Sequence, residues 1–85
     1  MQEFQYTVKD ENGIHARPAG LLAHQAKSYQ SSVTMIYGEN SADVKRLFAL
    51  MKLNVKQGDT VTIQVSGADE TEAAHELEEF LNKNL

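Results

Sequence analysis

The chain has 85 residues and no cysteine, and its formal net charge is −4 at pH 7. So short a chain closes one hydrophobic core, and we expect a single domain over residues 1–85. The composition excludes disulfides and thiolate metal sites, predicts a cytoplasmic protein without membrane insertion, and disfavours nucleic acid as a partner.

The first half of the chain predicts a strand, a helix and a hairpin. Residues 4–8 alternate apolar and polar side chains as a half-buried strand does. The segment SVTMIY at 32–37 alternates in the same way, and GEN at 38–40 predicts a turn into a short polar strand near SADV. Between the first two strands, residues 16–28 carry small and apolar side chains at helical spacing, namely Ala19, Leu22, Ala23 and Ala26.

The second half predicts a short helix over 46–53, a strand over 60–65 and a longer helix from residue 69. Asp69 and Glu72 have the spacing of a capping box at the start of that last helix. The order is therefore β-α-β-β-α-β-α. With a central hairpin, it predicts an α+β fold, a two-layer open-faced sandwich in which three helices cover one face of a four-stranded antiparallel sheet.

A histidine stands where the first helix begins. The sequence NGIHARPAG places His15 at the N-cap and leaves the backbone N–H groups of Ala16, Arg17 and Ala19 without helical partners, while Pro18 has no N–H to lose. Open amides, the positive end of a helix and a guanidinium together make an anion site. Beside them, the imidazole is a nitrogen nucleophile. The pattern favours a histidine that accepts a phosphoryl group, although a capping or surface histidine fits the same residues.

The histidines do not predict a metal site. His15, His24 and His75 lack the close spacing of metal ligands. Along the predicted helix, His24 lies roughly 13 Å from His15 and on the other side. The spacing also gives no Ser-His-Asp arrangement and no paired carboxylates. We therefore expect no metal and no cofactor.

Four stretches closely resemble the HPr family: GIHARPAG (13–20), AKSY (26–29), VKRLFALMKLNVKQGDTV (44–61) and GADETEAAHEL (67–77). HPr is the histidine-containing phosphocarrier of the bacterial phosphoenolpyruvate-dependent sugar phosphotransferase system. The resemblance extends over essentially the whole chain. It implies a monomeric carrier, not an enzyme, that takes a phosphoryl group from phosphorylated Enzyme I and passes it to the A domains of sugar-specific permeases.

The resemblance also implies the roles of particular residues. His15 matches the phosphoryl acceptor, through its Nδ1 atom. Arg17 matches the arginine that steadies the phosphoryl group, and Ala16 contributes a backbone N–H.

Partner contacts can be placed in the same way. Six of the eight residues in RLFALMKL (46–53) are apolar, which is more than one buried stripe can use. Leu50 and Leu53 suit the core, while Leu47, Phe48 and Met51 would be partly exposed and suit a docking surface. The positions that match the family's partner-binding face are Gly20, His24, Lys27, Leu47, Phe48 and Met51.

One position departs from the family pattern. Many HPr proteins of low-GC Gram-positive bacteria carry a serine where this chain has Arg46, and an ATP-dependent kinase phosphorylates it. Arg46 has no hydroxyl, so the regulatory serine is missing, and the role is not transferred to Ser41. Two alternatives stay open. One is a regulatory paralogue, of the nitrogen-related type or another, phosphorylated on His15. The other is a small module whose anion pocket binds a ligand without covalent chemistry.

Overall fold

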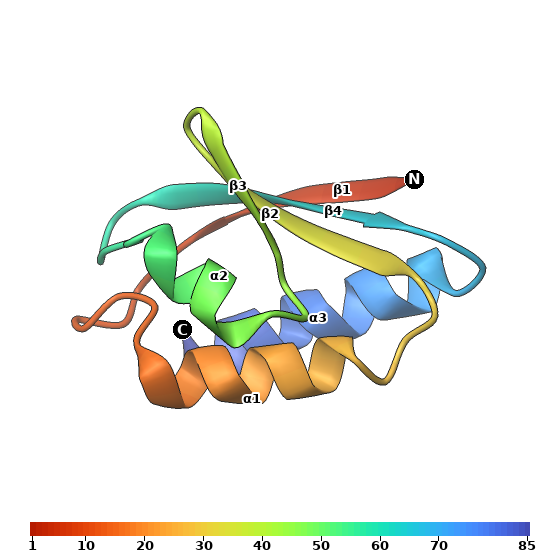
Figure 1. Cartoon of the computed structure of the whole chain (residues 1–85), viewed down its shortest axis with the longest axis horizontal. Coiled ribbons are helices and arrows are strands. Elements are labelled where there is room, and N and C mark those ends of the chain that lie inside the picture. The colour runs from red at the N-terminus through yellow and green to blue at the C-terminus, as the bar shows by residue number, and fades with distance from the viewer.

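The computed structural model describes residues 1–85, and its elements follow the predicted order. The four strands pair antiparallel in the order β1-β4-β2-β3. All three helices lie on one face of this sheet, which confirms the predicted two-layer α+β class (Figure 1). The elements are β1 (Gln2–Thr7), α1 (Ala16–Ala26), β2 (Ser32–Tyr37), β3 (Asn40–Asp43), α2 (Leu47–Lys52), β4 (Thr60–Ser66) and α3 (Glu70–Asn84).

The central hairpin forms where the sequence predicts it. Tyr37 pairs with Asn40, so only Gly38 and Glu39 make the turn between β2 and β3. Gly38 has a φ of 60°, a left-handed conformation that glycine adopts without strain and that tight hairpin turns require. The third strand is one residue displaced from the predicted SADV segment, because the turn is shorter than the GEN motif suggests.

The core lies between the sheet and the helices. Alternate strand residues point into it, as the periodicity predicts, and each helix contributes one apolar stripe. Leu50 and Leu53 are buried, which confirms their predicted place. Side chains that are at most 2% exposed come from α1, α2, α3, β2 and β4, for example Leu22, Leu50, Leu77, Met35 and Ile63.

The predicted capping box at the start of α3 is wrong. Asp69 holds the N-cap position but makes no side-chain cap hydrogen bond. Its carboxylate accepts hydrogen bonds from the amides of Gln30 and Ser31, both at 2.9 Å, and from the Ser31 hydroxyl. Those amides have no backbone acceptor, so the carboxylate satisfies the loop after α1 instead of its own helix. Glu72 is exposed, and it is Glu70 that accepts from an upstream amide.

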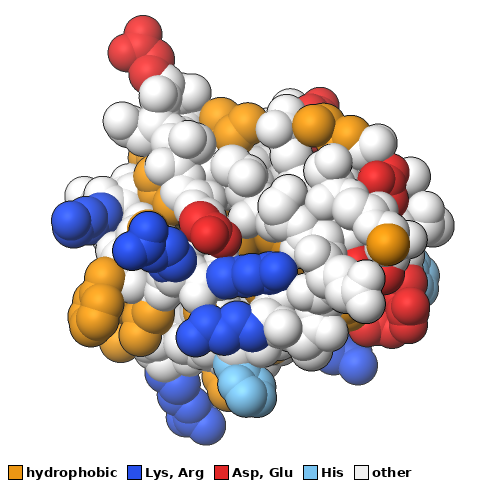
Figure 2. Space-filling model, turned by 45° about the vertical axis from the view of Figure 1, so that its right-hand side comes forward, with side chains coloured by type: hydrophobic (Ala, Val, Ile, Leu, Met, Phe, Trp, Pro, Cys, Tyr) orange, Lys and Arg blue, Asp and Glu red, His pale blue; other side chains and the backbone are white.

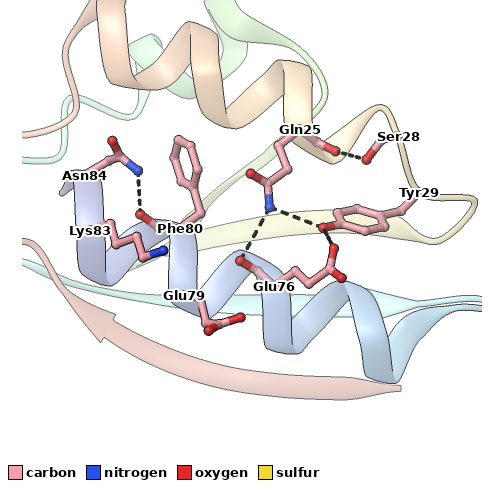
Figure 3. A pocket seen from close by; sticks show the side chains of 8 residues that line it. All are labelled: Gln25, Ser28, Tyr29, Glu76, Glu79, Phe80, Lys83 and Asn84. Carbon is pink, nitrogen blue, oxygen red and sulfur yellow. Dashed lines mark hydrogen bonds between the residues drawn. The ribbon is translucent and has the colours of Figure 1, made fainter.

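A second polar contact joins α1 to α3 (Figure 3). The Tyr29 hydroxyl donates to Glu76, and the Gln25 side-chain amide donates to the Tyr29 oxygen at 3.2 Å and to the Glu76 carbonyl at 3.4 Å. Burial, and then the hydrogen bond to Glu76, raise the pKa of Tyr29 to about 12. The hydroxyl therefore stays a donor at physiological pH. Together with the Asp69 contacts, it fixes the two long helices relative to each other.

We expect Asp69→Asn to lower the thermal unfolding midpoint by several degrees at neutral pH. The Ser31 hydroxyl, and then the Gln30 amide, hold the pKa of Asp69 below its ordinary value of 3.8. A carboxyl whose pKa is lowered by folding stabilises the native state above its unfolded pKa, and this contribution is lost as the pH falls through the folded pKa. The difference in unfolding midpoint between Asp69→Asn and the unchanged protein should therefore shrink as the pH falls below 3.8, as circular dichroism can measure. Glu72→Gln is the control, and a deficit that stays constant down to the lowest pH would contradict the account.

Candidate functional site

The loop between β1 and α1 is held by backbone contacts on several sides. The Ile14 amide donates to the Val55 carbonyl at 3.0 Å, and the amides of Lys9 and Asp10 donate to the Leu85 carbonyl. Gly13 has a φ of 66°, and any side chain there would collide with the Val55 carbonyl and the Lys56 backbone. The missing side chain therefore allows this loop to lie against the chain that follows α2, and the loop then delivers His15 to the helix start.

His15 occupies the N-cap of α1, with φ −109° and ψ 176°. Its carbonyl accepts the Ala19 amide at 3.0 Å, so the prediction of a free Ala19 donor is wrong. The reason is general: the N-cap carbonyl takes the first intrahelical hydrogen bond. The amides of Ala16 and Arg17 donate to no group of the protein, and the imidazole does not cap them. Two N–H groups thus remain open beside the ring.

The ring and the guanidinium share a small hollow. Its volume is about 240 Å³, and its lining includes His15, Arg17, Pro18 and Leu21. The His15 side chain is 39% exposed, and its Nε2 lies 3.5 Å from Oδ2 of Asp10. The Arg17 side chain is exposed and forms no ion pair within the protein, so its charge is available to a ligand.

The sequence analysis did not predict three residues that line this hollow: Asp10, Leu21 and Asn84. Asp10 lies five residues before His15 and meets it through a loop, not along a helix face, so periodicity does not reveal it. The available signal was the turn chemistry of Asp10, Asn12 and Gly13. Hydrogen bonding from the Asn12 amide, and then the contact with His15, hold the pKa of Asp10 below its ordinary value, so it is a carboxylate at pH 7.

The residues predicted to bind partners lie along α1 and α2. Gly20 and Leu47 are half-buried, and His24 and Lys27 are exposed on α1. Phe48 is 76% exposed and Met51 is 38% exposed. Figure 2 shows hydrophobic side chains beside a group of Lys and Arg side chains on this face, and several carboxylates at its right edge. We call the following set the docking surface: Gly20, His24, Lys27, Leu47, Phe48 and Met51.

Other parts of the molecule offer less to a ligand. A larger hollow, about 490 Å³ in volume, lies between α1 and α3, but Gln25, Tyr29 and Glu76 in its lining already bond to one another (Figure 3). No three metal-ligating side chains gather anywhere in the chain. None of the helices has both the length and the apolar character needed to span a bilayer.

Comparisons with known proteins agree with this geometry. The family of the PTS HPr component phosphorylation site matches residues 2–83. Phosphocarrier protein HPr of Mycoplasma genitalium is 38% identical over 85 residues, which cover 99% of this chain and 97% of that protein. A crystal structure of HPr-C-His from Thermoanaerobacter tengcongensis is similar with a TM-score of 0.94 and 30% identity, covering 99% and 94% of the two chains. Crh, the catabolite repression containing protein of Bacillus subtilis, was crystallised as a dimer with a swapped domain and is similar with a TM-score of 0.79 and 29% identity, covering 100% and 98%.

The fold, the family match and the relatives define a small protein of the phosphocarrier class. The chain belongs to the HPr family of the phosphotransferase system.

We expect Gly13→Ala to lower the free energy of unfolding by about 1–3 kcal/mol, because the new methyl group meets the Val55 carbonyl in a strained backbone conformation. Gly38→Ala is the matched control, since its φ of 60° is similar but nothing lies within 4 Å of the added carbon. Urea denaturation should show the larger loss for Gly13→Ala. Equal losses would mean that the backbone contact with Val55 adds nothing.

Proposed function

We propose that this chain carries phosphoryl groups in sugar uptake. Phosphorylated Enzyme I would transfer the group to Nδ1 of His15, and His15 would pass it to the A domains of sugar-specific permeases. One observation carries the proposal: a partly exposed imidazole at the start of α1, next in the chain to two open amides, with the Arg17 side chain lining the same hollow. A nucleophile beside an anion site is what phosphoryl transfer asks of a protein.

Each group has a role in the transfer. The lone pair of Nδ1 forms the new N–P bond while the donor's bond to phosphorus breaks, and that electron pair stays with the donor atom. The amides of Ala16 and Arg17 and the positive end of α1 face the phosphoryl oxygens, whose negative charge they stabilise. The Arg17 guanidinium adds a planar pair of donors suited to the same oxygens. The reverse movement of electrons returns the phosphoryl group to the next protein.

The docking surface is proposed to bind both Enzyme I and the A domains. An exposed aromatic ring that contributes little to the core is the kind of residue that anchors a protein interface. The cations around it favour partners with acidic surfaces and speed their association. Arg46, exposed at the N-cap of α2, extends this positive region.

A regulatory role is the second candidate, and Arg46 favours it. The family's regulatory serine is absent, so a carrier with this residue lacks that form of control. Crh, which shares this fold, is named for catabolite repression. In this alternative His15 still takes the phosphoryl group, but regulatory proteins receive it. Complementation of sugar uptake in a strain without its own HPr separates the two, since only a sugar carrier restores growth.

We further propose that residues 1–85 act as one HPr-type domain and as a monomer. The core is continuous through all three helices and the sheet, which favours a single folding unit. Light scattering with size-exclusion chromatography checks the oligomeric state. A dimer at micromolar concentration would overturn the monomer and bring the chain closer to Crh.

We expect the purified protein to gain one phosphoryl group when mixed with Enzyme I and phosphoenolpyruvate. The product should be labile in acid and stable in base, as a phosphohistidine is, and intact-mass spectrometry should find none on His15→Ala. His75→Ala is the matched control, because His75 is an exposed histidine on α3 away from the site, and it should be phosphorylated as the unchanged protein is. Unchanged phosphorylation of His15→Ala would remove the assignment.

We expect Phe48→Ala to raise the KM for this protein in the Enzyme I reaction roughly tenfold, the size of a moderate interface contact. The ring is 76% exposed, so the unfolding midpoint should hardly change. Gln5→Ala, on the open face of the sheet, is the control and should leave KM unaltered. A normal KM for Phe48→Ala would show that partners do not bind at this surface.

A further inference from the structure

One carboxylate faces the His15 ring. Oδ2 of Asp10 lies 3.5 Å from Nε2, and no other protein group bonds to the imidazole. This distance is at the long limit of a hydrogen bond, and such contacts in unliganded sites often shorten when the partner binds. A carboxylate only accepts hydrogen bonds, so the nitrogen that faces it must carry the proton.

Asp10 is held in place independently of the ring. Its Oδ1 accepts the Asn12 amide at 2.8 Å, its carbonyl accepts the Gly13 amide at 2.9 Å, and its own amide donates to Leu85 at 2.8 Å. One carboxylate oxygen is therefore engaged in the loop, and the other is left for His15. The direction of this second oxygen is fixed before any partner arrives.

We propose that Asp10 is a positioning residue for the carrier reaction: it holds the proton of the neutral His15 ring on Nε2, so that Nδ1 presents its lone pair to phosphorus. The inference rests on the proposed function and specifies how the acceptor atom is selected. A neutral imidazole has two tautomers, and only the nitrogen without the proton is a nucleophile. Nδ1 accepts no hydrogen bond from the protein and lies on the ring opposite the side that Asp10 engages.

The same carboxylate acts during the transfer. When the Nδ1 lone pair forms the N–P bond, the proton remains on Nε2 and the ring becomes positively charged. Asp10 then faces a cation and stabilises it, in the way that a buried aspartate stabilises the imidazolium of a catalytic triad. When the phosphoryl group leaves, the N–P electron pair returns to Nδ1 and the ring is neutral again. The contact therefore assists acceptance, and it keeps the proton on Nε2 through both acceptance and release, without exchange of a proton with solvent.

Two substitutions separate this role from a structural one. Asp10→Ser keeps an oxygen that can accept the Asn12 amide but is too short to reach the ring. Asp10→Asn also keeps that acceptor, and it turns an N–H group toward Nε2, which favours the proton on Nδ1. Glu11→Gln is the matched control, because Glu11 is an exposed carboxylate in the same loop, and its removal changes the net charge equally.

The tautomer of His15 is read from its two ring-nitrogen NMR signals, at a pH where the ring is neutral. We expect the Nε2–H form in the unchanged protein and in Glu11→Gln, more Nδ1–H form in Asp10→Ser, and mostly Nδ1–H in Asp10→Asn. In the Enzyme I reaction, kcat should fall roughly tenfold to hundredfold for Asp10→Asn, and less for Asp10→Ser, with KM nearly unchanged.

The outcomes for Asp10 and for the carrier function are distinct. An Nδ1–H ring in the unchanged protein, tautomers that do not respond to the Asp10 variants, or a normal kcat for Asp10→Asn would each overturn the role of Asp10. Failure of the unchanged protein to gain any phosphoryl group would instead overturn the proposed function. In that case the tautomer signals alone would still decide whether Asp10 orients the ring.

Discussion

The close approach of Gly13 and Ile14 to the backbone of Val55 is the constraint on which the site depends. Val55 lies in the connection between α2 and β4, so this contact joins the loop before His15 to a distant part of the chain. With the loop fixed there, His15 falls at the N-cap of α1 and not further along the helix. At that position the ring lies beside open amides, and at any later one those amides would be used within the helix.

Much of the fold could be predicted because hydrophobic periodicity reports burial directly. The alternation in β1, β2 and β4 and the stripe of α1 each face one common core, so local pattern and tertiary packing agree. Where local pattern and tertiary contacts compete for the same group, the prediction from sequence was wrong. Asp69 has the right residue type and spacing for a cap, but two unpaired amides and the Ser31 hydroxyl, about forty positions away in the sequence, take its carboxylate. The sequence near α3 does not indicate that distant groups bind the Asp69 carboxylate.

The site was partly predictable because some of its residues are neighbours in the sequence. His15, Ala16 and Arg17 are adjacent in sequence, and the rules of helix starts place them together. Asp10 and Asn84 reach the site through a loop and through the end of α3, and such contacts depend on tertiary structure. The exposure of Phe48 could be inferred because six of the eight residues in RLFALMKL (46–53) are apolar, and a short helix has only one face to bury.

The attachment of the β1–α1 loop to Val55 and Leu85 affects how this protein can meet other molecules. A segment that backbone hydrogen bonds already hold in the free protein loses little conformational freedom on association. In the proposed relay, donor and recipient would therefore encounter the same rigid shape, and neither complex would have to be tight to be correctly aligned. Low affinity for each partner, combined with a fixed shape of the binding loop, suits a small carrier protein that must dissociate from each partner quickly.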